Sequence, residues 1–175
     1  METKKFRGYH WLVLIVIVAS LLDSTIAASF AQWIMQPQFM GVPQLVLQSL
    51  LLMVLIGPAP SFDLPLAAVA GLLVDMWTTG LIGVHLLVWP LTLYLLKQVK
   101  PYVPNSPLFH WLVMLMTLFI AMLGEMVINQ LFGYVPLSAS DWVAERVAPG
   151  FIVNTIIFMI SYLPLRRILL NLGKK

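Results

Sequence analysis

The stretch Gly71-Leu72-Leu73-Val74-Asp75-Met76-Trp77-Thr78-Thr79-Gly80-Leu81-Ile82-Gly83 places a carboxylate in the middle of an apolar segment. A carboxylate at membrane depth is costly, so it normally faces protein or water and marks a functional surface. Ala67, Gly71, Asp75 and Thr79 follow one another at intervals of four, which lines them on one face of a helix. We therefore predict that this small-residue face approaches another helix closely, with Asp75 as its polar anchor.

The composition around this stretch indicates a membrane protein. Of the 175 residues, 61% are hydrophobic and only 10% are charged, whereas charged residues make up about a quarter of a typical soluble chain. No polar stretch is long enough to fold separately in water, so we predict a single polytopic membrane domain over residues 1–175. The net charge of +3 comes from basic residues at segment ends and does not indicate a nucleic-acid partner.

Six apolar segments predict an all-α fold, a compact bundle of about six transmembrane helices. The first, fifth and sixth segments reach the roughly 20 residues that a crossing needs. The other three are short and broken by glycine and proline, and such segments need protein or water around them. We therefore expect the short helices in the centre of the bundle, away from lipid. The predicted segments are Tyr9–Met35, Pro43–Ile56, Leu64–Thr79, Val84–Leu96, Leu108–Phe132 and Gly150–Leu169.

Basic residues predict the orientation. Nine of the ten Lys and Arg residues fit an arrangement in which both termini and the loop after Lys97 are cytoplasmic, and only Arg146 lies outside it. This requires an even number of crossings. The turn at residues 57–63 carries no basic residue, however, so five crossings with a re-entrant hairpin stay possible. We expect the basic ends to contact anionic membrane lipids.

Four further polar residues are expected between the midplane and the outer face: Asp23, Glu125, Asn129 and Asn154. They could line an outward-facing polar cavity or grip another helix. Alternatively, each carboxylate forms hydrogen bonds with Ser, Thr or Asn on a neighbouring helix and only fixes the packing. The three histidines are far apart and cysteine is absent, so we expect no metal site. We also expect neither a cofactor nor enzymatic activity, because the sequence has no nucleophile–base signature and no phosphate loop.

The run Gly71-Leu72-Leu73-Val74-Asp75, followed eight residues later by Gly83, resembles the motif of the MreD family of rod shape-determining proteins. The chain length and the basic pair Lys97 and Lys100 after the fourth segment are similar too. The resemblance implies a non-enzymatic subunit in the cell membrane of a bacterium. Its implied partner is MreC, a single-span protein, and through it MreB, RodA and a class B penicillin-binding protein. The implied outcome is sidewall peptidoglycan synthesis and control of cell shape.

The resemblance also implies a six-helix fold like that of the substrate subunits of energy-coupling-factor transporters, and this supplies an alternative function, vitamin binding. We favour the scaffold, because the outer loops are poor in the aromatic and polar groups that a vitamin pocket needs. In the scaffold, the structural or partner-binding motif consists of Ala67, Gly71, Asp75, Thr79, Gly80 and Gly83. We expect Asp75 to accept hydrogen bonds from backbone N–H groups of the Thr78–Gly83 turn, so that Asp75→Asn is mild and Asp75→Leu disruptive.

Overall fold

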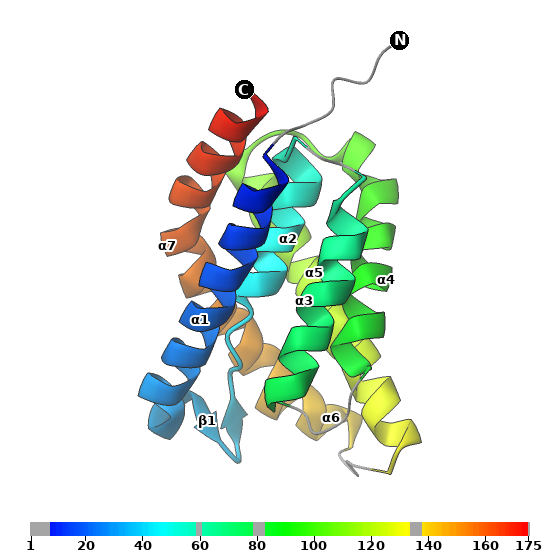
Figure 1. Ribbon diagram of the computed structural model, residues 1–175. Helices are drawn as coiled ribbons and strands as arrows, with labels where there is room; N and C mark the ends of the chain where they lie inside the picture. The colour runs from blue at the N-terminus through cyan, green and yellow to red at the C-terminus, as the bar shows by residue number, and fades with distance from the viewer. Residues whose placement is uncertain (1–7, 59–60, 79–82, 134–137, 175) are drawn as a thin grey trace.

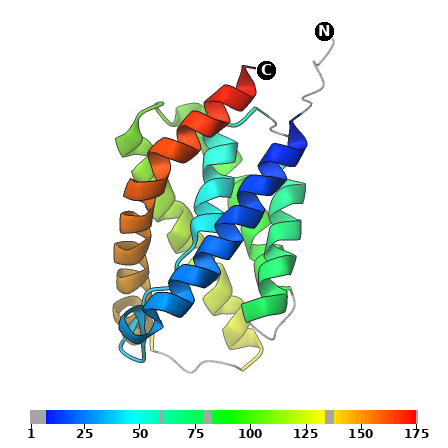
Figure 2. The ribbon, with the colours of Figure 1, turned by 60° about the vertical axis from the view of Figure 1, so that its left-hand side comes forward.

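The computed structural model describes residues 8–58, 61–78, 83–133 and 138–174, and the side chains of Trp77 and Thr78 are not described. Within these ranges the long helices run side by side in a bundle (Figures 1 and 2). They are α1 (Tyr9–Ile34), α2 (Leu45–Ile56), α3 (Asp63–Thr78), α4 (Val84–Val99), α5 (Pro107–Leu131) and α7 (Ala148–Gly173). The bundle is all-α except for a small antiparallel hairpin that joins α1 to α2, formed by β1 (Met35–Gln36) and β2 (Phe39–Met40).

Three helical runs of the described chain are long and apolar enough to cross a membrane. They are α1, α5 and the continuous run Ala139–Gly173. That run joins the short helix α6 (Ala139–Trp142), the π-helical turn η2 (Val143–Val147) and α7. The last long helix therefore begins at α6, and its N-cap is Ser138. The helices α3 and α4 have 16 residues each, which is roughly 24 Å of helix against a hydrocarbon core of about 30 Å.

Helix α2 occupies the centre of the bundle. It packs against α1, α3, α4, α5 and α7, and every residue from Leu45 to Leu55 is buried. Helices that are apolar all round belong in a core, and α2 has this character. The central position expected for the short second segment is therefore found.

The third and fourth segments are not shielded from the surroundings as expected. Met76 on α3 is 67% exposed and Leu87 on α4 is 65% exposed, and both helices carry other exposed apolar side chains. Over the described residues α3 and α4 are each continuous helices. Helical backbone bonds mostly within its own segment, so these two helices can face lipid.

The two ends of the bundle differ in charge. Both termini lie at one end, together with the α2–α3 and α4–α5 connections, while β1 and α6 lie at the other end (Figure 1). The 3-10 turn η1 (Lys100–Tyr102) follows α4 at the end that holds the termini. At this end lie Lys97, Lys100, Arg166, Arg167 and Lys174, whereas Arg146 lies in η2 at the opposite end. The polar residues discussed below lie in the half that contains the hairpin.

Candidate functional site

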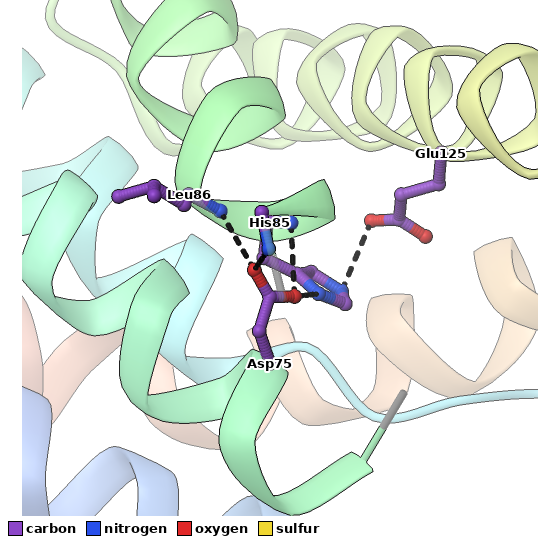
Figure 3. A network of polar contacts seen from close by, with 5 residues as sticks. Asp75, His85, Leu86 and Glu125 are labelled. Atoms are coloured by element: carbon purple, nitrogen blue, oxygen red, sulfur yellow. Dashed lines mark hydrogen bonds and ion pairs between the residues drawn. The ribbon is translucent and has the colours of Figure 1, made fainter. Parts of the chain in front are cut away.

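Asp75 caps the start of α4 from the last turn of α3. Its Oδ2 accepts hydrogen bonds from the backbone N–H of Gly83 at 2.9 Å and of Leu86 at 3.2 Å. Its Oδ1 accepts from the backbone N–H of His85 at 3.0 Å and lies 2.6 Å from His85 Nδ1 (Figure 3). The first N–H groups of a helix have no partner within the helix and favour a negative charge. Asp75, which is only 1% exposed, supplies both a hydrogen-bond acceptor and a negative charge.

This geometry changes the expected effect of Asp75→Asn. Both carboxylate oxygens accept N–H groups, so the amide nitrogen of an asparagine would face a backbone donor in either orientation. A buried donor without an acceptor costs about 1–3 kcal/mol. This geometry therefore predicts that Asp75→Asn is destabilising and not mild.

His85 extends the Asp75 contact to a third helix. Its Nε2 lies 3.5 Å from Oε1 of Glu125 on α5, an ion-pair distance that is long for a hydrogen bond. The ring also packs edge-on against Trp89, with centroids 5.1 Å apart. His85 therefore bridges α3, α4 and α5, a role that the sequence did not assign to it. Its position ten residues after a buried carboxylate was the available signal.

The small-residue face of α3 packs against α4 of the same chain. Ala67 is fully buried, and a Cβ atom added to Gly71 would lie 2.5 Å from the backbone carbon and oxygen of His85. Gly83 has a φ of +116°, a left-handed conformation that favours glycine. Thr79 and Gly80 lie outside the described residues. Ala67, Gly71 and Asp75 therefore make their contacts within the chain. Any effect of these residues on a partner is transmitted through α3 and α4, the helices that they join.

Asp23 caps the start of α2, as Asp75 caps the start of α4. From the middle of α1, its two oxygens accept the backbone N–H groups of Leu45 at 2.8 Å and Val46 at 2.9 Å. Helix α2 has no capping side chain of its own. Of the two alternatives for Asp23, bonding to Ser, Thr or Asn side chains is not the one found: its partners are backbone groups at a helix start. The sequence separation of 22 residues hid this pairing.

Asn154 on α7 holds the same helix start from the other side. Its Oδ1 accepts the backbone N–H of Gln44 at 2.8 Å and the side chain of Gln48 at 3.0 Å. Its Nδ2 donates to the carbonyl oxygens of Val42 at 2.8 Å and Gly150 at 2.9 Å. Sequence reasoning placed Asn154 in the outer polar zone but missed Gln44 and Gln48, which looked like ordinary residues at the edge of an apolar segment.

A cavity of about 430 Å³ lies between these helices in the half that holds the hairpin. Asp23, Glu125 and Asn129 line it, as does His85, whereas Asn154 is buried behind its partner Gln44. In the described part of the chain, no group of three or more His, Asp or Glu side chains is placed to hold a metal ion. The arrangement therefore orders helices around a mixed polar and apolar space.

The family comparison adds an assignment to this geometry. Residues 5–172 match the family model described as rod shape-determining protein MreD. The chain belongs to the MreD family. Its role is accordingly in rod shape determination, within a family of structural membrane proteins. Neither the curated proteins nor the solved structures contain a match, so the likeness to energy-coupling-factor substrate subunits stays a prediction. Membership of the MreD family gives no support to vitamin binding.

Proposed function

We propose that this MreD-family chain is a non-enzymatic scaffold of the bacterial elongation complex that binds MreC within the cell membrane. Through MreC it would work with MreB, RodA and a class B penicillin-binding protein to direct sidewall peptidoglycan synthesis. We place both termini in the cytoplasm. The observation that carries this proposal is the family match over residues 5–172.

The exposed faces of α3 and α4 are the surface that we propose for the MreC helix. The Asp75 cap, the His85 contact and the close approach at Gly71 fix these two helices to each other. On the outside of the pair, Val69 is 56% exposed and Leu91 is 61% exposed. A rigid pair of helices presents such a surface without losing conformational freedom on binding, which favours association.

The test is mild-detergent affinity purification of the chain from its native membrane, followed by mass spectrometry of the proteins recovered with it. The proposal expects MreC and cell-wall synthases. Val69→Trp on α3 should lower the MreC yield, whereas Ile156→Trp on the exposed face of α7 should leave it unchanged. Recovery of a coupling subunit with paired ATPases in place of MreC would reject the proposal, and an equal yield from both variants would reject the surface.

A further inference from the structure

The cavity in the hairpin half has the size and construction of a ligand site. Its volume of about 430 Å³ falls in the range of about 300–1,000 Å³ that small-molecule sites occupy. Its walls come from α1, the hairpin, the start of α2, α3, α4, α5, α6 and η2. The Asp23 and Asp75 caps hold the starts of two of these helices in place, so the walls are fixed before any ligand arrives.

Methionine supplies much of the apolar wall. Four of the chain's ten methionines line the cavity: Met35, Met40, Met122 and Met126. Methionine is unbranched and polarisable, and it adapts to ligands of varied shape. Trp89, Trp142 and four valines, Val42, Val46, Val74 and Val84, also belong to the apolar lining. Because the methionine side chains can rearrange, these walls can follow a flexible, unbranched hydrocarbon chain.

Hydrogen-bond donors and acceptors also line the cavity. The side chains of Asn129 and Arg146 have no hydrogen-bond partner within the described ranges; Asn129 can donate and accept, and Arg146 can donate. Among the described residues, Glu125 Oε1, Gln44 Oε1 and Trp89 Nε1 are buried without a hydrogen-bond partner. Buried polar atoms of this kind are uncommon where packing alone sets the sequence.

The charges of the lining balance one another. Arg146 lines the same space as Glu125, with His85 beside Glu125, while the carboxylate of Asp23 is compensated by the start of α2 that it caps. A ligand with a net charge would add an unpaired charge between these largely apolar walls, which is costly. A head group that donates and accepts hydrogen bonds without a net charge, as hydroxyl and amide groups do, meets no such cost.

We propose that this cavity binds an amphipathic molecule with one flexible hydrocarbon chain and an uncharged, hydroxyl- or amide-bearing head group. The chain lies against the methionine wall, and the head group contacts Asn129, Arg146 and Glu125. This ligand site is separate from the proposed MreC surface, which lies on the outside of α3 and α4. It can therefore exist whether or not MreC binds there.

The test measures retention of radiolabelled decanoyl glycerol by the full chain in phosphatidylcholine nanodiscs, with retention by empty nanodiscs subtracted. The proposal expects saturable retention. Competition by decyl phosphate and by decyltrimethylammonium, which carry the same hydrocarbon length with charged heads, should be weaker than competition by unlabelled decanoyl glycerol. Equal or stronger competition by a charged probe would overturn the assignment of an uncharged head. Free glycerol should not compete, and competition by it would overturn the role of the hydrocarbon chain.

Matched variants locate the binding. Met126→Trp fills the cavity and should weaken retention by about tenfold, because an overfilled site must be forced open. Met159→Trp makes the same change on the exposed face of α7 and should bind as the unaltered chain does. Asn129→Leu keeps the branching of the side chain but removes its hydrogen-bonding groups, and it should reduce the preference for the uncharged head. Helical circular dichroism verifies that each variant is folded. Retention that does not saturate, or that is equal in Met126→Trp, would mean partitioning into lipid and would overturn the proposal.

Discussion

At the scale of single residues, two carboxylates that sequence reasoning placed in the membrane have the same structural role. Asp23 accepts the first N–H groups of α2, and Asp75 accepts those of α4. In each case the carboxylate belongs to the preceding helix. An uncapped helix start at membrane depth leaves donors that lipid cannot satisfy, so these residues reduce the cost of ending a helix inside the membrane. Glu125 differs, because its contact is with the His85 side chain.

Gly71 provides a test of the close approach of α3 and α4. In Gly71→Ala the new Cβ would meet the backbone of His85 at 2.5 Å, so the helices must separate, at an expected loss of about 1–3 kcal/mol in the free energy of unfolding. In Gly124→Ala the Cβ would meet only methyl groups of Val88, at 3.1 Å and 3.2 Å, and we expect a smaller loss. Thermal unfolding in detergent, followed by circular dichroism, measures both. Equal losses would contradict a backbone contact at Gly71.

At the scale of the elements, α2 depends on side chains from both neighbours. It has twelve residues and no capping side chain of its own, so Asp23 from α1 and Asn154 from α7 hold its first N–H groups. Helices α3 and α4 are likewise held at both ends. At the end opposite Asp75, Lys97 Nζ on α4 lies 3.5 Å from Asp63 Oδ2 at the start of α3. Each short helix is therefore positioned by contacts at its ends as well as along its side.

Asp23→Ala should weaken the start of α2 specifically. Loss of a capping side chain costs about 0.5–2 kcal/mol, and the amides of Leu45 and Val46 lose the acceptor that Asp23 provides. Hydrogen exchange of these two amides, measured by mass spectrometry, should become faster while exchange in the middle of α5 stays the same. Asp141→Ala, at an exposed residue, is the matched control. Unchanged exchange at Leu45 and Val46 in Asp23→Ala would rule out the cap.

Local contacts were predictable from the sequence, and contacts between distant segments were not. The contact between Asp75 and the turn at Gly83 joins residues eight apart, so a carboxylate near a glycine-broken helix end was enough to suggest it. The contacts of Asn154 with Gln44 and Gln48 join residues 110 and 106 apart. These contacts depend on which helices become neighbours. A helix that is apolar on all sides carries no sequence pattern that identifies its neighbours. The same lack of an amphipathic pattern explains why exposure of α3 and α4 was missed.

At the scale of the whole molecule, charge and polarity divide the bundle into two ends. The described basic residues gather where the termini lie, with the exception of Arg146, and the cavity lies in the other half. Basic residues mark the cytoplasmic side of membrane proteins. We therefore predict that the cavity lies in the outer half of the membrane and that the α2–α3 connection is on the cytoplasmic side.

Single cysteines test this orientation without background, because the chain has no cysteine of its own. We expect Ser61→Cys, Asn105→Cys and Lys174→Cys to be protected from an impermeant maleimide added outside sealed, right-side-out vesicles. Cysteines at Gln38 and Ser140 should be labelled, and opening the vesicles with detergent should expose all five. Labelling of Ser61→Cys from outside would contradict six crossings in this order and favour another path for α2 and α3.

The most direct test of the central claim, that a buried carboxylate holds α4 to α3 with both oxygens, is thermal unfolding of Asp75→Asn beside Asp75→Leu. Because both Asp75 oxygens accept N–H groups, we predict that the asparagine variant loses about 1–3 kcal/mol or more in the free energy of unfolding. Its midpoint should fall close to that of the leucine variant. Asp141→Asn, the same change at an exposed site, should unfold as the unaltered chain does. An Asp75→Asn midpoint equal to that of the unaltered chain would contradict the account.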